Sequence, residues 1–148
     1  MKMSTKGRYG LRFMIDLATN GNAQDKVSLQ QVAKRQAISE KYLWQIANRL
    51  KAAGLVSAVP GAHGGYRIAR KPEEITLVDI LEALEGKLTL VPCVKTASVC
   101  SRSGACVSRT IWQEVNRKMV AAMKSITLGN IITKQTAMLE QTPLMYAI

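Results

Sequence analysis

The chain has 148 residues, which suits one domain or a small domain with an arm. Its formal net charge is +11, and 47% of its residues are hydrophobic but only 5% aromatic, so a core would be mostly aliphatic. Its apolar runs all fall short of the about 18 residues that a membrane-spanning helix needs, so no membrane span is expected. The N-terminal residues lack the apolar segment of a secretory signal, and we therefore expect a cytoplasmic protein.

Nearly all of the excess positive charge lies in the first half of the chain. Residues 1–71 contain 13 Lys and Arg against 3 Asp and Glu, whereas residues 72–148 contain 8 against 7. A polyanion is the natural partner for such a half, and nucleic acid is the common one. A surface that is basic only for solubility is the alternative. Anionic lipid is disfavoured, because no basic amphipathic segment stands apart from a core pattern.

The first half of the chain predicts three helices. Apolar residues recur at helical spacing over about residues 5–19, which predicts the first helix. Ser28, followed three residues later by Gln31, forms a capping box and predicts the start of the second. Ser39 is expected to cap the third helix, which Gly54 ends.

The third helix is strongly amphipathic. Leu43, Ile46 and Leu50 share one face, whereas the opposite side is basic and rich in amides and carries no carboxylate. The residues on that side and its flanks are Lys41, Trp44, Gln45, Asn48 and Arg49. Such a helix can read base edges in the major groove. A solvated helix face, with Trp44 as half-buried support, is the alternative.

A β-hairpin is predicted after the third helix. Residues 55–59 and 66–69 read as strands, and the glycine-rich turn between them allows close approach of the backbone to DNA. We expect His63 to be a polar residue of the turn rather than a metal ligand, and Tyr66 to pack within the hairpin. Thr76 then begins a fourth helix.

All three cysteines lie in one short loop, at about residues 92–107. Cys93, Cys100 and Cys106 fall within 14 residues, and their spacing lacks the paired knuckles of a zinc site. An intracellular cysteine cluster more often binds metal or reacts than forms disulfides. Three thiols would supply three of the four protein ligands that an iron–sulfur cluster usually takes. Three reduced thiols without metal, or a redox switch without a cluster, are the alternatives.

A last long helix is predicted over about residues 108–125. Its apolar residues cover more than one stripe and include Ile111, Trp112 and Val115. We expect this helix to pack both on its own domain and on a partner chain; burial wholly within one chain is the alternative. The tail after Gly129 has only a weak pattern and is expected to be partly mobile.

The order of these elements is that of a winged helix-turn-helix protein. The predicted fold class is mainly α with a small β-hairpin. The expected organisation is a DNA-binding domain over residues 1–88, a cysteine-containing cluster-binding loop over 89–107, a dimerisation helix over 108–128 and a C-terminal tail over 129–148. The residues expected to contact DNA are Lys6, Arg8, Ser28, Ser39, Lys41, Tyr42, Gln45, Arg49, His63, Gly64 and Gly65.

Several segments together resemble the IscR/NsrR/CymR family of bacterial winged-helix regulators. They are residues 4–10 (Ser-Thr-Lys-Gly-Arg-Tyr-Gly), 38–43 (Ile-Ser-Glu-Lys-Tyr-Leu), 54–56 (Gly-Leu-Val), 61–66 (Gly-Ala-His-Gly-Gly-Tyr), 75–80 (Ile-Thr-Leu-Val-Asp-Ile) and 85–86 (Glu-Gly). The resemblance covers about residues 1–128. It implies a homodimer held by the long C-terminal helix and bound to palindromic double-stranded promoter DNA. For members with three cysteines in this loop, it also implies a two-iron or four-iron iron–sulfur cluster.

The chain departs from the family where the fourth cluster ligand is concerned. Arg109 stands where the iron–sulfur-biogenesis regulator has a histidine ligand, and Arg8 stands where the nitric-oxide sensor takes an aspartate from the partner subunit. The fourth ligand is therefore unknown. Trp44 stands where the biogenesis regulator has an acidic residue in its reading helix, and Pro60 stands where it has an arginine in the wing. The DNA sequence that this chain recognises is therefore not predicted.

Together these features predict a dimeric DNA-binding transcriptional regulator. The resemblance implies that an iron–sulfur cluster sensing iron, redox state or nitric oxide controls its promoter binding. One alternative is a cluster-free regulator of the same fold that senses thiol oxidation or a metabolite. A small iron–sulfur redox protein or enzyme is disfavoured, because the chain lacks a nucleophile–base pair, a phosphate-cradling loop and an acid pair in a cleft.

Overall fold

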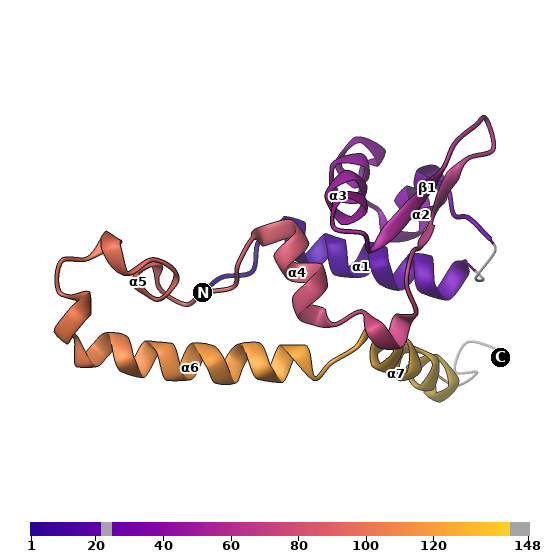
Figure 1. Ribbon diagram of the computed structural model, residues 1–148. Coiled ribbons are helices and arrows are strands. Elements are labelled where there is room, and N and C mark those ends of the chain that lie inside the picture. Colours follow the sequence, from indigo (N-terminus) through magenta and orange to yellow (C-terminus); the bar gives the residue numbers. More distant parts are fainter. Residues whose placement is uncertain (22–24, 143–148) are drawn as a thin grey trace.

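The computed structural model describes residues 1–21 and 25–142 (Figure 1). The helices are α1 (Thr5–Asn20), α2 (Leu29–Gln36), α3 (Glu40–Ala52), α4 (Leu77–Glu85), α5 (Pro92–Lys95), α6 (Val107–Lys124) and α7 (Leu128–Gln141). The strands are β1 (Val56–Val59) and β2 (Gly65–Ile68), and short 3-10 turns lie at Pro72–Glu74, Ala97–Val99 and Ser103–Ala105. The predicted fold class, mainly α with a small β-hairpin, is confirmed.

Side-chain caps fix where the main helices begin. Ser4, Ser28, Ser39 and Thr76 each accept a hydrogen bond from a backbone N–H of the first turn that follows. Each cap satisfies a donor that the helix itself leaves unpaired. The capping box at Ser28 and the helix starts predicted at Ser39 and Thr76 are therefore confirmed.

One aliphatic core joins α1, α2, α3, α4, α7 and the β-hairpin into a single body, which contains the predicted DNA-binding unit, and α1 runs through its middle. α1 contacts α2, α3, α4, α7 and β2. The apolar stripe predicted for α3, including Leu43, Ile46 and Leu50, is fully buried. The other large side chains with less than 2% exposure are Phe13, Met14, Leu17, Val32, Leu55, Ile75, Ile80, Leu84 and Leu128. The core thus leaves only the polar side of α3 facing outward.

The two strands form an antiparallel hairpin in the register Val56↔Ile68 to Val59↔Gly65. Tyr66 in β2 pairs with Val27 and packs edge-to-face on Phe13, with 6.2 Å between ring centroids. Its predicted role in hairpin packing is confirmed. A Cβ atom at Gly65 would lie 2.5 Å from the carbonyl oxygen of Val27, so only glycine fits where the hairpin meets the start of α2.

The tail predicted over residues 129–148 was expected to be partly mobile, but its first part, up to Gln141, belongs to the helix α7, which begins at Leu128. Thr127 and Asn130 make a capping box at its start, Leu128 is fully buried, and Ile132 packs on the core. The backbone N–H of Leu128 donates to the carbonyl of Ile75 at 2.8 Å. Few of the apolar residues of α7 reach the core, which is why its sequence pattern is weak. Residues 143–148 of the predicted tail lie outside the described residues.

The long helix α6 extends away from this body, and the cysteine loop lies at its far end (Figure 1). α6 contacts its own chain through α4 and α5. Residues 92–105, predicted as a loop, contain the single turn α5 and two 3-10 turns. Within residues 1–21 and 25–142, no helix has the length and apolar character that crossing a lipid bilayer requires.

Candidate nucleic-acid interface and cysteine site

The outward side of α3 presents the predicted reading residues to solvent. Lys41, Gln45 and Arg49 are exposed, and Trp44 is 56% exposed. Tyr42 is half-buried and packs edge-to-face on Tyr9, with 5.9 Å between ring centroids. The structure therefore brings the predicted α3 residues onto one accessible face, with Tyr42 at its edge. Trp44 projects from this face instead of supporting it from beneath.

A buried carboxylate holds the helix-turn-helix in place. Asp16 of α1 is only 2% exposed and accepts two hydrogen bonds from Arg35, at 2.7 and 3.0 Å, and one from Gln36 at 2.9 Å. Gln36 in turn accepts from Arg12 through its side chain and its carbonyl. These contacts tie the last turn of α2 to α1, and so fix the turn that leads into α3.

The same contacts set the charge state of Asp16. Burial alone would raise the pKa of its carboxyl group, but the hydrogen bonds from Arg35 and Gln36 and the Arg35 charge outweigh burial and lower the pKa below its ordinary value. Asp16 is therefore an anion in the folded protein. Sequence reasoning missed it, although an acid among the apolar residues of the first helix was a usable signal.

The turn between α2 and α3 is built on an unusual residue. Ala37 has a φ of 53° and a ψ of 45°, the left-handed conformation. Among the described residues it is the single non-glycine with positive φ. Its backbone N–H donates to the carbonyl of Ala33, and Ile38 follows as a buried anchor. This tight reversal lets α3 project from the body.

The wing and the start of α2 form a second group of predicted DNA contacts. His63, Gly64 and Ser28 line one polar cleft together with Lys26 and Gln31. His63 is exposed at the hairpin turn. Lys6 and Arg8 lie apart from this cleft, in the first turn of α1. His63, Gly64 and Ser28 therefore lie around one cleft, and Lys6 and Arg8 are not among the residues that line it.

The first turn of α1 is itself fixed by a carboxylate. Glu85, the last residue of α4, accepts hydrogen bonds from the backbone N–H groups of Ser4 and Gly7, each at 3.2 Å, and from the Ser4 hydroxyl. A negative group at a helix N-terminus is favoured by the helix dipole. This contact joins the end of α4 to the segment that carries Lys6 and Arg8.

The three cysteines occupy different parts of the loop. Cys93 lies in α5, Cys100 is exposed directly after the 3-10 turn Ala97–Val99, and the Cys106 Sγ caps α6 by accepting from the N–H of Arg109 at 3.4 Å. The Arg109 Nε also donates to the carbonyl oxygen of Cys93 at 2.8 Å. Arg109 thus links the two ends of the loop and stays a hydrogen-bond donor, a role unlike that of a metal ligand.

All three thiols are free, and thiolates are the ligands that iron–sulfur clusters take. The donor chemistry therefore fits such a cluster. Within residues 1–21 and 25–142, however, no three His, Cys, Asp or Glu side chains come together in a group that could hold a metal ion. The loop of a single chain does not by itself present a closed set of ligands.

α6 carries an apolar face that its own chain leaves open. Val107 is 77% exposed, Ile111 52%, and Trp112 and Val115 42% each. Large apolar side chains seldom gather in solvent unless a partner covers them. The predicted packing of α6 on its own domain is present through α4, and its other side remains available.

A winged helix-turn-helix with a polar reading helix, an exposed wing and basic flanks defines a DNA-binding protein of the regulator type. Residues 3–134 match the Rrf2 family, which is described as an iron-dependent transcriptional regulator. The chain therefore belongs to the Rrf2 family, and the resemblance drawn from its motifs is confirmed.

Individual relatives agree with this assignment. Protein rrf2 of Nitratidesulfovibrio vulgaris is 39% identical over 132 residues, which cover 89% of this chain and 87% of that protein. The HTH-type transcriptional regulator IscR of Aliivibrio salmonicida is 32% identical over 132 residues, or 89% and 77% of the two chains.

Two solved structures are also similar. One is CymR (YrzC), the global cysteine regulator of B. subtilis, with a TM-score of 0.74, 34% identity and coverage of 90% of this chain and 98% of that one. The other is T. potens IscR, with a TM-score of 0.72, 36% identity and coverage of 99% and 96%.

Proposed function

We propose that this regulator acts as a homodimer on palindromic promoter DNA and that an iron–sulfur cluster, held by Cys93, Cys100 and Cys106, controls its DNA binding. The observation that carries the proposal is the double role of Cys106. Its Sγ is both a candidate ligand and the cap of α6. A change at this sulfur therefore acts directly on the first turn of the helix that we expect to hold the dimer.

The dimer part of the proposal is supported by the open face of α6. Pairing of two such helices would cover Ile111, Trp112 and Val115, which are 42–52% exposed in one chain. A symmetric pair presents the same patch twice. It would also set the separation of the two α3 helices, and half-sites on palindromic DNA lie about one helical turn apart. A small shift at α6 would therefore change the fit to DNA.

When bound, an iron–sulfur cluster supplies a centre whose charge and ligands change with redox state, iron supply or nitric oxide. This chain's own residues would hold the loop around it. Ser103 donates to the Cys100 carbonyl at 2.6 Å, and Arg109 holds the Cys93 carbonyl at 2.8 Å. Because the Arg109 side chain already donates a hydrogen bond to the Cys93 carbonyl, we expect another group to supply the fourth ligand of the cluster.

A second candidate function rests on the exposure of Cys100. Cys100 is exposed and, in the part of the chain that the structure describes, belongs to no three-ligand group. Such a thiol can be oxidised, and the regulator would then sense oxidation without iron. The structure of CymR, a cysteine regulator, is similar to this chain.

Anaerobic purification separates the two functions. We expect the wild-type protein to be brown and to contain iron and acid-labile sulfide, and Cys100→Ala to lose both. Ser101→Ala, next to it in the chain, is the matched control and should keep them. A colourless wild-type protein whose Cys100 reacts reversibly with peroxide would support the thiol sensor in place of the cluster.

A further inference from the structure

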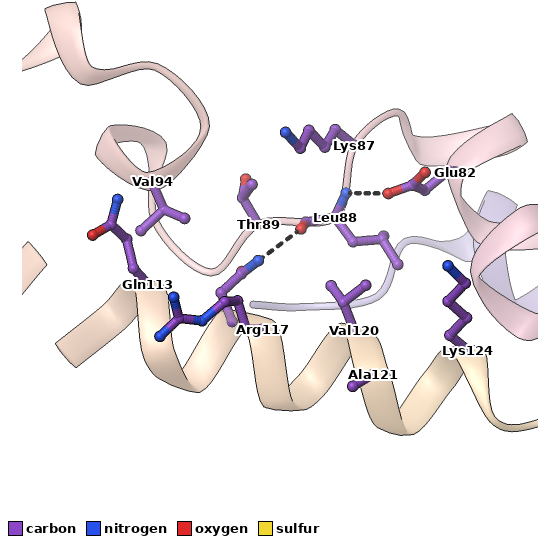
Figure 2. Close-up of a pocket in the computed structure, with 11 residues that line it drawn as sticks. Glu82, Lys87, Leu88, Thr89, Val94, Gln113, Arg117, Val120, Ala121 and Lys124 are labelled. Atoms are coloured by element: carbon purple, nitrogen blue, oxygen red, sulfur yellow. Dashed lines mark hydrogen bonds between the residues drawn. The ribbon is translucent and has the colours of Figure 1, made fainter. Parts of the chain in front are cut away.

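A pocket of about 510 Å³ lies where the DNA-binding unit joins α6 (Figure 2). It is formed by the end of α4, by the linker that follows it and by one side of α6. Its size falls within the range of small-molecule sites, about 300–1,000 Å³. It contains none of the three cysteines and none of the predicted DNA contacts, so neither the cluster nor the duplex accounts for it.

The floor of the pocket is apolar. By the floor we mean the apolar part of the lining, which consists of Leu88, Val94, Val120 and Ala121; Leu88 is 4% exposed. Figure 2 shows Leu88 from the linker facing Val120 on α6 across the pocket. An apolar floor of this kind would accept a short hydrocarbon body.

The rim of the pocket is cationic. Lys87, Arg117 and Lys124 surround the floor, and none of the three forms an ion pair with any residue in the described part of the chain. The carboxylate in the lining, Glu82, accepts a hydrogen bond from the backbone N–H of Leu88. A guanidinium and two ammonium groups favour a carboxylate or a phosphate, and the planar guanidinium can bind either with two parallel hydrogen bonds.

The pocket and the open apolar face lie on different sides of α6. Val120 lines the pocket and Val115 belongs to the open face. At 100° per residue these two positions are about 140° apart around the helix. Ile111 lies about 180° from Val120 and Trp112 about 80°, so pairing of α6 helices through Ile111 and Val115 would leave the pocket accessible.

The linker under the pocket is tied to both of its neighbours. Glu82 of α4 accepts from the N–H of Leu88 at 3.3 Å, and the side-chain amide of Asn116 donates to the Leu88 carbonyl at 3.3 Å. The Asn116 Oδ1 also accepts from the N–H of Leu90 at 2.8 Å, and this asparagine is only 8% exposed. A molecule in the pocket would touch α4, the linker and α6 at once, and so act on their relative positions.

We propose that this pocket is an effector site for a small anionic metabolite, with one carboxylate or phosphate group on an apolar body of a few carbon atoms. The anionic group would bind the Arg117 guanidinium, Lys87 and Lys124 would add positive potential around the rim, and the apolar body would lie on Leu88 and Val120. Binding there would change the affinity of the protein for DNA, independently of any cluster.

Methyl-resolved NMR of the full-length protein tests the site, with hexanoate as the probe and hexanol as its neutral counterpart. We expect hexanoate to shift the methyl signals of Leu88 and Val120 in a saturable way and to leave those of Val115 unchanged. Hexanol should bind at least about tenfold more weakly, because it cannot pair with the cations. Equal binding of the two probes, or no shift at Leu88 and Val120 because a partner segment fills the pocket, would overturn the site.

Charge variants complete the test. Arg117→Gln combined with Lys124→Gln should weaken hexanoate binding about tenfold or more, whereas Lys118→Gln, on another side of α6, should not. At fixed ionic strength, saturating hexanoate or hexyl phosphate should change the affinity of the wild-type protein for promoter DNA. Neither probe should change the DNA affinity of the double variant. The probe with the larger effect on the wild-type protein shows whether the site prefers a carboxylate or a phosphate. If the methyl shifts occur and DNA affinity stays the same with both probes, the regulatory role is wrong.

Discussion

Replacing Asp16 with asparagine removes a buried charge that organises the helix-turn-helix. The wild-type carboxylate accepts three hydrogen bonds of 2.7–3.0 Å from Arg35 and Gln36. Hydrogen bonds to a charged group contribute about 1.5–3 kcal/mol each. Asparagine keeps one acceptor oxygen, and Arg35 has a side chain that is 37% exposed, so water compensates part of the loss. We therefore expect Asp16→Asn to lower the free energy of unfolding by about 2–3 kcal/mol.

Thermal unfolding measures this loss. For a chain of this length, about 2–3 kcal/mol corresponds to a fall in Tm of roughly 4–12 °C. Glu114→Gln is the matched control, because it removes a carboxylate from the exposed Glu114–Lys118 pair at 3.1 Å, where less than about 0.5 kcal/mol is expected. An Asp16→Asn variant as stable as this control would refute the view that Asp16 holds the reading unit in place.

The pH dependence provides an independent check on Asp16. Its pKa in the folded protein lies below the ordinary value of 3.8, so its contribution to stability is present above about pH 4 and is lost as the pH falls through the folded pKa. The wild-type protein should therefore lose more stability than Asp16→Asn on acidification below about pH 4. Parallel acid transitions for the two proteins would show that the carboxylate is not selectively stabilised in the fold.

Three further predictions concern the turn, the wing and the dimer. Ala37→Gly should raise the free energy of unfolding by about 0.5–1 kcal/mol, because glycine adopts the left-handed conformation without strain; lower stability would contradict this. Gly65→Ala should weaken DNA binding and destabilise the hairpin, as DNA titration and thermal unfolding would show, whereas Gly104→Ala, where a Cβ meets nothing within 4 Å, should leave the thermal stability unchanged. Val115→Asp should convert the dimer to monomer in light scattering, and an unchanged mass would show that α6 does not pair through this face.

Much of the DNA-binding unit could be predicted from local sequence signals. Capping residues such as Ser28 and Thr76 act within one helical turn, and the stripe of α3 repeats over three turns, so both appear directly in the sequence. The exposed reading face follows from that stripe. Helix α7 was missed because its burial depends on docking against α1 and on contacts such as Leu128 with Ile75, which only the folded chain creates.

The sites were less accessible to sequence reasoning. An acid among the apolar residues of the first helix signals that Asp16 is unusual, but its partners Arg35 and Gln36 lie about twenty positions away, and no local pattern identifies them. The pocket beside α6 depends on Asn116 reaching back to Leu88, across 28 positions. The spacing of the cysteines indicates soft ligands, but within residues 1–21 and 25–142 the three thiols do not form a group that could hold a metal ion, and the spacing alone does not predict that arrangement.

The affinity of one promoter duplex for cluster-loaded and cluster-free protein tests the central proposal most directly. The two forms should be prepared from the same anaerobic sample and compared at equal salt concentration, since phosphate contacts make binding steeply salt-dependent. We expect the affinities to differ by about tenfold or more, a change of about 1.4 kcal/mol or more, and the difference to vanish in Cys100→Ala. Equal affinity of both forms at every promoter tested would contradict control of DNA binding by the cluster.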